Sequence, residues 1–364
     1  MKIAFYGSSL LSSYWNGAAT YYRGILGALA GLGHEITFYE PDAFSRQQHR
    51  DIDPPEWCRS VVWTADEAGL REVVAEAADA DVVVKASGVG VYDGELLEGV
   101  MAAARPGALR LFWDVDAAAT LDEMAADPGH PVRRALPELD IVLTYGGGPP
   151  VIDRYRSFGA AACVPVYNAL DPASHHPVQA DPRFATDLSF LANRLPDREA
   201  RVEEFFLRPA ALLPDKRFLI GGNGWETKDM TANVERIGHV GTASHNAFNC
   251  SATAVLNVAR DSMARVGFSP ATRVFEAAGA GACLITDAWE GIEMFLAPGA
   301  EVLVARDGQD VADILTDLTP RRARAIGDAA LARVLAEHTY ARRAVEVDAL
   351  LTRMAAQVAS GAAA

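Results

Sequence analysis

The stretch from Ser269 to Asp287 reads S-P-A-T-R-V-F-E-A-A-G-A-G-A-C-L-I-T-D and predicts one helix followed by one buried strand. Ser269 is suited to cap the helix, and Pro270 is suited to its first position, where no N–H is needed. Gly279 and Gly281 can end the helix in a left-handed conformation. The apolar residues that follow have strand character and end at an acidic side chain. A helix that leads directly into a buried strand is typical of α/β folds.

Glu276 gives this helix a possible chemical role. It lies seven residues after Ser269, which is about 10 Å of helical rise. A helix N-terminus attracts anions, because its first N–H groups are unpaired and the dipole is positive there. A ligand with phosphates at the cap could therefore present two sugar hydroxyls to Glu276, as a nucleotide diphosphate would. The alternative is an ordinary helix in which Glu276 is solvated or paired with Arg273.

The composition excludes several classes of protein. The chain has 364 residues and a formal net charge of −15, from 48 acidic and 33 basic residues. This balance argues against a nucleic-acid partner or an anionic lipid surface, both of which need a basic face. The four cysteines form no C-x-x-C pair, so neither zinc nor disulfides are expected. No apolar run approaches the ~18 residues of a membrane span, and we expect a cytoplasmic protein.

Strands and helices alternate along the whole chain, which predicts two doubly wound α/β domains. In the first half the expected strands are 2–6, 35–39, 81–85, 109–113, 140–144 and 162–167, with helices at 18–32, 70–78, 95–104 and 151–158. The second half repeats the pattern, with strands near 188–192, 217–220, 254–258, 282–287 and 301–304. Between them lies a segment rich in Pro, Asp and Ala. We expect a first domain at 1–168, a link at 169–185, a second domain at 186–340, and a C-terminal helix and tail at 341–364 that cross back to the first domain.

Several segments of the chain resemble one known family. They are Y-N-A-L-D-P-A-S-H-H-P (167–177), D-L-S-F-L-A-N-R-L-P-D-R (187–198), F-L-I-G-G-N-G-W (218–225), L-N-V-A-R (256–260) and S-P-A-T-R-V-F-E-A-A-G-A-G (269–281). With L-A-G-L-G-H-E-I-T-F-Y (29–39), they resemble bacterial GT-B glycosyltransferases of the spore-maturation CgeB-like group, whose C-terminal domain is of the group 1 type. The resemblance implies two Rossmann-like domains facing a central cleft, with a nucleotide-sugar donor on the second and an acceptor mainly on the first.

The resemblance also implies roles for particular residues. Glu276 occupies the position of the glutamate that binds the donor ribose. Many retaining members carry a second glutamate eight residues earlier, where this chain has Phe268. Retention of the anomeric configuration is the favoured outcome, and Phe268 leaves inversion open. Arg194 and Arg198 match the basic pair that neutralises the diphosphate, although salt bridges with Asp197 or Glu199 are the alternative.

Other candidates lie where the two sheets are expected to end. For the donor these are Arg273, Ser269, the backbone N–H groups of Gly267 and Phe268, the loop glycines Gly222 and Gly224, His239, and from the first domain Gly7, Asn16, Gly17 and Gly147. Asp114 and Asp116 follow a first-domain strand, and one of them could be a general base in an inverting enzyme, or could simply cap the next helix. His175 and His176 point to opposite sides of an extended segment, so we interpret them as structural and expect no metal.

Taken together, these features predict a hexosyltransferase-like enzyme that moves a sugar from a nucleotide diphosphate to an unidentified glycan, small molecule or protein. The donor is a substrate, and no cofactor is expected. Two alternatives remain: a nucleotide-sugar epimerase of the same fold, and a non-catalytic nucleotide-sugar-binding protein.

Overall fold

The computed structural model describes residues 1–14 and 16–361, which form two compact units. The first unit contains residues 1–167 and 340–361, and the second contains residues 168–339. The link expected at 169–185 therefore belongs to the second unit, and the return to the first unit occurs at Tyr340.

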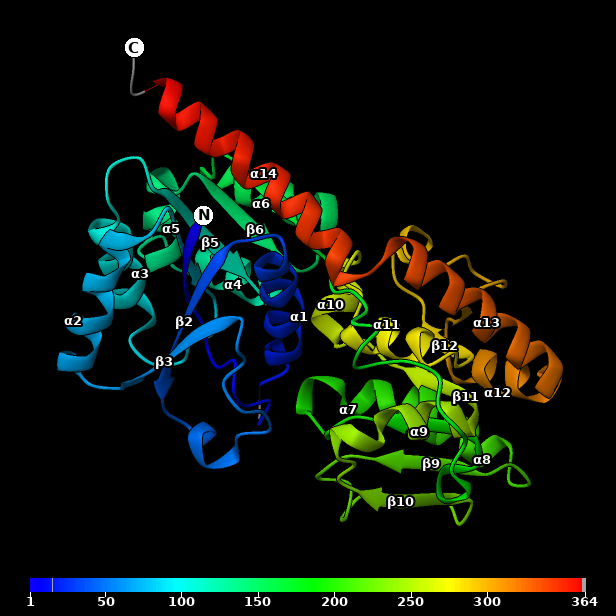
Figure 1. Ribbon diagram of the computed structural model, residues 1–364. Coiled ribbons are helices and arrows are strands. Elements are labelled where there is room, and N and C mark those ends of the chain that lie inside the picture. The colour runs from blue at the N-terminus through cyan, green and yellow to red at the C-terminus, as the bar shows by residue number, and fades with distance from the viewer. Residues whose placement is uncertain (15, 362–364) are drawn as a thin grey trace. The chain divides into compact units, whose positions relative to one another are not determined.

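The first unit is built on a seven-stranded, all-parallel sheet of order β3-β2-β1-β4-β5-β6-β7 (Figure 1). Its strands are β1 Lys2–Tyr6, β2 Glu35–Asp42, β3 Cys58–Thr64, β4 Val82–Ala86, β5 Leu109–Asp114, β6 Ile141–Thr144 and β7 Cys163–Pro165. Its helices are α1 Ala18–Gly31, α2 Glu67–Ala75, α3 Asp93–Ala103, α4 Ala117–Ala126, α5 Pro131–Ala135, α6 Gly148–Ser157 and α14 Tyr340–Gly361. Strand order reverses between β1 and β4, and such a reversal opens a ligand crevice at the carboxyl ends of the strands.

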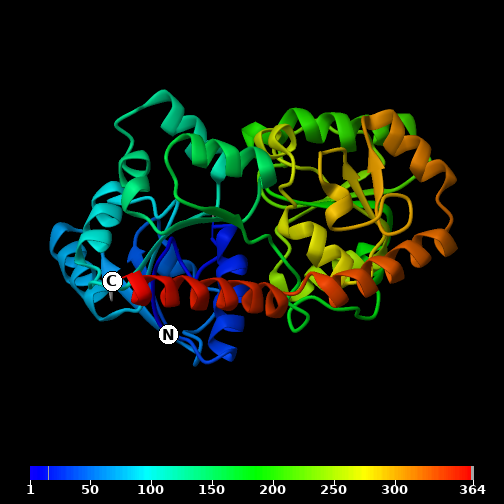
Figure 2. The ribbon, with the colours of Figure 1, turned by 90° about the horizontal axis from the view of Figure 1, so that it is seen from above.

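The C-terminal helix α14 packs on α1 of the first unit, as the sequence predicted (Figures 1 and 2). Tyr340 stands directly over Gly24, where an added Cβ would lie 2.3 Å from its ring. Three residues after the C-terminal end of α1, Nε2 of His34 lies 2.9 Å from a carboxylate oxygen of Asp348 on α14. A helix from the far end of the sequence thus completes the apolar covering of the first sheet.

The second unit has a six-stranded parallel sheet of order β10-β9-β8-β11-β12-β13. Its strands are β8 Thr186–Leu191, β9 Phe218–Gly221, β10 Val234–Gly238, β11 Ala252–Asn257, β12 Leu284–Asp287 and β13 Leu303–Ala305. Its helices are α7 Pro196–Val202, α8 Arg208–Leu212, α9 His245–Ser251, α10 Asp261–Val266, α11 Thr272–Gly279, α12 Gly308–Asp317 and α13 Pro320–Glu337. The reversal of strand order falls between β8 and β11, and the core under it is built from apolar residues of both strands, including Leu188, Phe190 and Leu256.

The structure confirms the predicted α/β architecture and adds two edge strands. Residues 58–64 and 234–238 are β3 and β10, whereas the sequence analysis had assigned neither as a strand. Both lie at the outer edge of their sheet, where half of the residues face solvent and the apolar run is broken. Within the described residues, no helix is both long and apolar enough to cross a bilayer.

Candidate functional site

The most chemically distinctive cluster of the second unit lies at the reversal of its strand order. Arg198 comes from α7, which follows β8, and Arg260 lies just after β11. Arg273 and Glu276 are on α11, which leads into β12. Three arginines and a carboxylate therefore meet at the edge of the sheet where ligands bind in open α/β folds.

Arg198 is a partly buried cation that is attracted by the carboxylates of Asp197 and Asp287 but forms no close ion pair with either. Its Nε is buried and has no hydrogen-bond partner, and the side chain forms no ion pair with any described residue. Burial lowers the pKa of Arg198, and the positive charges of Arg260 and Arg273 act in the same direction, while the carboxylates of Asp197 and Asp287 raise it. The neighbouring carboxylate of Asp197 is hydrogen-bonded to Arg260 instead. Unused guanidinium donors among like charges favour the binding of an anion.

Glu276 and Arg273 lie side by side on α11 with unused hydrogen-bonding capacity. Their side chains are 13% and 17% exposed, and a guanidinium nitrogen of Arg273 lies 3.6 Å from Glu276 Oε2. That nitrogen is buried without a hydrogen-bond partner. Burial alone would raise the pKa of Glu276, but the charges of Arg273, His175 and His245 outweigh it and hold the pKa below its usual value. The carboxylate is therefore ionised at neutral pH, and both oxygens can accept hydroxyl donors.

Two histidines also face this carboxylate: His175, which was predicted from the sequence to be structural, and His245, which was not predicted to have a role. Nε2 of buried His175 lies 3.9 Å from Glu276 Oε1, and His245 on α9 offers a ring nitrogen within 4.8 Å of both. His245 also contacts the carbonyl of Val240 through Nε2, at 3.2 Å. Only the pairing of distant segments could reveal this group, because its members are 70 and 31 residues apart.

The two histidines and Glu276 lie close enough together to be considered for a metal ion, but two features of the group do not favour one. Ligand atoms on one tetrahedral zinc ion are roughly 3.3 Å apart, as Zn–N bonds of about 2.0–2.1 Å require. Here the nitrogen of His175 is already 3.9 Å from the carboxylate oxygen, and the Arg273 guanidinium occupies the other side of that carboxylate. A fixed positive charge at that distance opposes a metal cation.

The predicted cap of the helix was wrong. Helix α11 begins at Thr272, after the extended residue Ala271, and the hydroxyl of Ser269 donates back to the Gly267 carbonyl at 2.8 Å. The carbonyl of Pro270 accepts a hydrogen bond from the side chain of Asn168, 102 residues away, which holds this segment out of the helix. Glu276 therefore lies five residues after the true cap, about 7 Å along the axis, and closer to the N-terminus than the sequence suggested.

The backbone N–H groups of Gly267 and Phe268 were also wrongly predicted to be available to phosphates. The N–H of Gly267 is bonded to the Met263 carbonyl at 2.9 Å, and that of Phe268 to the Glu290 carbonyl at 2.6 Å. Phe268 has a φ of +47°, and its ring packs against Gly291, where a Cβ would lie 2.3 Å away. This segment closes the turn between α10 and α11 and leaves the guanidinium groups as the nearby donors.

Arg194, the other predicted phosphate ligand, is held by Glu199, as the salt-bridge alternative proposed. Two of its nitrogens contact the carboxylate at 3.0 and 2.6 Å, and Lys228 joins the same carboxylate at 2.9 Å. Gly222 is needed here because its Cβ would lie 2.1 Å from the carbonyl oxygen of Ala192 at a φ of +115°. The loop that contains Gly222 and Gly224 thus packs on the segment that carries Arg194.

His239 is exposed and lines a separate pocket of about 490 Å³. Its other walls are formed by Arg183, Phe184, Glu235, Ile237, Val240, Gly241 and Ser244. The pocket lies between the edge strand β10 and the start of α9. His239 makes no contact with Glu276 in the described structure.

Of the two first-unit carboxylates, Asp114 does not fit the role of a general base. It is fully buried and accepts hydrogen bonds from Tyr155, Ser87, Thr120 and the backbone N–H of Asp116. Burial raises its pKa, while these donors act in the opposite direction. Asp116 is partly buried at the start of α4, and its side chain makes no capping hydrogen bond to the helix. Asp116 therefore remains the candidate base of this pair.

The remaining first-unit candidates have structural surroundings. Asn16 is buried and bonded to Ser8, Ser9 and Ser12, so it holds the loop after β1 in shape. A Cβ on Gly7 or Gly147 would clash with Phe38 or Val151, whereas Gly17 faces open space. The glycines at 7 and 147 thus allow close packing.

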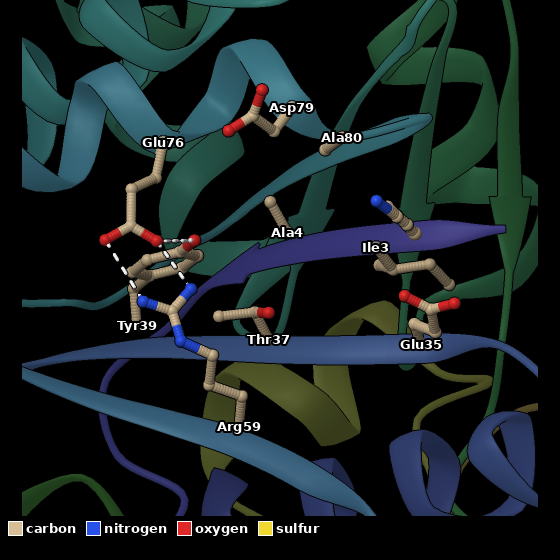
Figure 3. A pocket seen from close by; sticks show the side chains of 10 residues that line it. Ile3, Ala4, Glu35, Thr37, Tyr39, Arg59, Glu76, Asp79 and Ala80 are labelled. Atoms are coloured by element: carbon tan, nitrogen blue, oxygen red, sulfur yellow. Dashed lines mark hydrogen bonds and ion pairs between the residues drawn. The ribbon is translucent and has the colours of Figure 1, made fainter.

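A pocket of about 210 Å³ in the first unit lies nearer the amino ends of the strands (Figure 3). In it, Glu76 accepts hydrogen bonds from Arg59 at 2.6 Å and from Tyr39 at 2.8 Å. Because these charges satisfy one another at the edge opposite the crevice, the pocket is a weaker candidate than the arginine cluster.

Comparisons with known proteins concern the fold and the second unit. Residues 198–349 match the family described as glycosyl transferase-like, and this segment contains Arg198, Arg273 and Glu276. No match was found among curated protein sequences. Among solved structures, the chain is similar to a sucrose-phosphate synthase from Thermosynechococcus elongatus, with 16% identity, a TM-score of 0.72, and coverage of 98% of this chain and 100% of that one.

Two further solved structures contain nucleotides. Anabaena HepE in complex with UDP-glucose is 13% identical, with a TM-score of 0.65 and coverage of 97% of this chain and 100% of that one. An α-glucosyltransferase in complex with UDP is 9% identical, with a TM-score of 0.71 and the same coverage. The two Rossmann-like units thus have the GT-B fold, and the predicted class, a glycosyltransferase, is confirmed at the level of domain and fold.

Proposed function

We propose that this chain, which carries a glycosyl transferase-like domain on a GT-B fold, transfers a sugar from a UDP-sugar to an acceptor. The observation that carries the proposal is the unused hydrogen-bonding capacity of two arginines and one carboxylate at the reversal of the second sheet. Arg198 and Arg273 have buried guanidinium nitrogens without partners, and Glu276 has open carboxylate oxygens beside them. A nucleotide diphosphate offers phosphate oxygens to the guanidinium nitrogens and ribose hydroxyls to the carboxylate oxygens.

In this proposal the arginines bind the diphosphate. When the bond between sugar and phosphate breaks, negative charge grows on the leaving phosphate oxygens, and guanidinium groups already in place stabilise it. The repulsion between Arg198 and the like charges of Arg260 and Arg273 is already present in the folded protein before the donor binds. The same groups thus contribute both donor affinity and rate.

Glu276 would accept hydrogen bonds from the two ribose hydroxyls. Its lowered pKa keeps it ionised, and each hydrogen bond to a charged group contributes about 1.5–3 kcal/mol. The HepE and α-glucosyltransferase complexes hold UDP or UDP-glucose, which supports UDP as the first nucleotide to test.

We further propose that transfer retains the anomeric configuration. An inverting enzyme needs a general base, and Asp114 is too buried and too fully hydrogen-bonded to act as one. Asp116 is the alternative, so Asp116→Asn separates the two mechanisms: a loss of 100-fold or more in kcat would indicate inversion. The anomeric configuration of the product, read by NMR, decides the question independently.

Other properties follow from the same chemistry. We propose that transfer needs no metal, because arginines neutralise the diphosphate, and that activity survives EDTA.

A net charge of −15 disfavours DNA as acceptor, although one similar structure is a DNA-modifying β-glucosyltransferase. The four free thiols suit the reducing cytoplasm, and the quoted motifs suit the CgeB-like group.

A thermal-shift screen of nucleotides followed by a turnover assay tests the proposal. UDP at 100 times its Kd should stabilise the protein by about 2.7 kcal/mol. No response to any nucleoside diphosphate would refute the donor site. Slow hydrolysis of a UDP-sugar, or transfer to an acceptor, would then support an enzyme, whereas binding without either would favour the non-catalytic alternative. Conversion of the donor to a second UDP-sugar would favour an epimerase.

A further inference from the structure

The first unit presents one aromatic side chain in an unexpected way. Phe44 lies just after β2, at the carboxyl edge of the sheet, and 57% of it is exposed. Phe44 and Ser45 both have left-handed backbone conformations, with φ of +55° and +56°, in a turn closed by a hydrogen bond from the Arg46 N–H to the Ala43 carbonyl. Such turns strongly favour Asn and Gly. A bulky residue in this conformation suggests that its exposed ring has a use.

The neighbouring residues hold that ring in place. The Arg46 guanidinium lies over the Phe44 ring, 5.0 Å from its centre, and is itself bonded to the carbonyls of Ser8 and Val89. On another side the ring lies against Gly90, where a Cβ would come within 2.7 Å of it. The loop that contains Gly90 is in turn fixed by Asp93, which accepts its backbone N–H and is paired with buried Lys85. The loops that follow β1, β2 and β4 thus all help to fix Phe44.

A second aromatic pair joins the loops that follow β1 and β2. Tyr14, in the loop after β1, is 41% exposed and stacks on His49 with ring centres 4.0 Å apart. His49 ends the short helical turn η1, Arg46–His49, which starts two residues after Phe44. This part of the edge also carries exposed polar side chains, including those of Asp42 and Arg50.

We propose that Phe44 is the stacking platform of an acceptor site, and that the acceptor presents a pyranose ring. The inference rests on the proposed function, since it names the class of molecule that receives the sugar. A pyranose has a flat face of C–H groups that packs on an aromatic ring, and hydroxyls at its rim that both donate and accept hydrogen bonds. The exposed ring of Phe44, with the Arg46 guanidinium over it and the exposed Asp42 near it in the chain, matches that division. A planar aromatic acceptor would instead require a closed apolar slot.

The test uses the full chain, saturating UDP and a defined set of probes. These are the methyl α- and β-glycosides of glucose, galactose, mannose and N-acetylglucosamine, observed by saturation-transfer NMR, with p-nitrophenol as the aromatic probe. We expect at least one glycoside to bind through the protons of one ring face. Phe44→Gly should weaken it by about tenfold, the scale of one stacking contact, and Phe44→Trp should preserve it. Leu32→Ala, which alters another exposed apolar side chain of the first unit, is the control and should leave the affinity unchanged.

A stability measurement separates this role from a structural one. Phe44→Gly relieves the left-handed strain, so its Tm should equal that of the natural chain or exceed it by up to about 2 °C. A fall in Tm with unchanged glycoside binding would mean that Phe44 serves the fold, and would overturn the proposal. Binding of p-nitrophenol but of no glycoside would overturn the pyranose assignment. The UDP shift of the same samples reports on the donor site independently, so failure at one site is distinguishable from failure at the other.

Discussion

Replacing Arg198 by Met should make the ligand-free protein more stable and its donor binding weaker. The guanidinium has a buried Nε without a partner and lies beside the charges of Arg260 and Arg273. A buried donor left unsatisfied costs about 1–3 kcal/mol, and methionine removes that cost while keeping an unbranched chain. We therefore expect the free energy of unfolding to rise by about 1–2 kcal/mol, or roughly 2–8 °C in Tm.

The same substitution should reduce UDP affinity. Loss of charge-assisted hydrogen bonds to a phosphate corresponds to about 1.5–3 kcal/mol, or roughly 10- to 150-fold in Kd. Thermal melts with and without UDP, and isothermal titration calorimetry, measure both effects on one sample. Arg208→Met is the matched control, because Arg208, on α8, is exposed and paired with Glu204 at 2.6 Å. It should lower stability slightly and leave the UDP affinity unchanged.

The outcome that refutes this reasoning is specific. If Arg198→Met lowers the Tm of the ligand-free protein and leaves UDP binding at the natural level, then Arg198 contributes to the fold through contacts with protein. The phosphate site would then have to be sought elsewhere on the sheet edge.

Three further predictions concern other residues. Burial, aided by Arg273, lowers the pKa of His245 from 6.5 to about 4, so the unfolded chain binds this proton first as the pH falls. This group alone should lower the free energy of unfolding by roughly 2–3 kcal/mol between pH 6.5 and about 4, and in urea titrations His245→Gln should reduce the pH dependence by that amount. Asp114→Asn should cost roughly 2–3 kcal/mol, because Tyr155 and Ser87 lose a charged acceptor, while UDP still binds the folded protein; loss of UDP binding without loss of stability would contradict this. Arg194→Met should change the UDP Kd by less than about threefold, since Glu199 and Lys228 already engage this network, and a tenfold change by calorimetry would return Arg194 to the site.

The arrangement of strands and helices was largely predictable from the sequence, because buried parallel strands are continuous apolar runs. The strand V-V-V-K-A at 82–86 is buried throughout and was expected within one residue. The edge strand β10, V-E-R-I-G, is half exposed, and its charged residues interrupt the apolar run by which a strand is predicted from sequence. Where a strand is buried on one side only, the pattern is weaker and depends on a partner strand far along the chain.

The candidate site was predictable in residue type but not in detail. The spacing of Glu276 and Arg273 correctly placed both on one helix, because i and i+3 positions share a face. The choice between Arg194 and Arg198 depends on Glu199 and Lys228, and the true start of α11 depends on a hydrogen bond from Asn168. His245 joins the site only through the packing of α9. Each of these contacts joins distant segments, and no local pattern encodes them.

The central claim, that Glu276 binds the ribose of a UDP-sugar, is tested most directly by comparing UDP with 2′,3′-dideoxy-UDP. Calorimetry of both ligands on the natural chain and on Glu276→Ala forms a thermodynamic cycle. The exposed Glu293→Ala serves as control and should leave both affinities unchanged. We predict that removing the two ribose hydroxyls weakens binding to the natural chain by about 1.5–3 kcal/mol of binding free energy. Glu276→Ala should weaken the binding of UDP by a similar amount, and the two losses of binding free energy should not add. Additive losses, or natural UDP affinity in Glu276→Ala, would contradict the account.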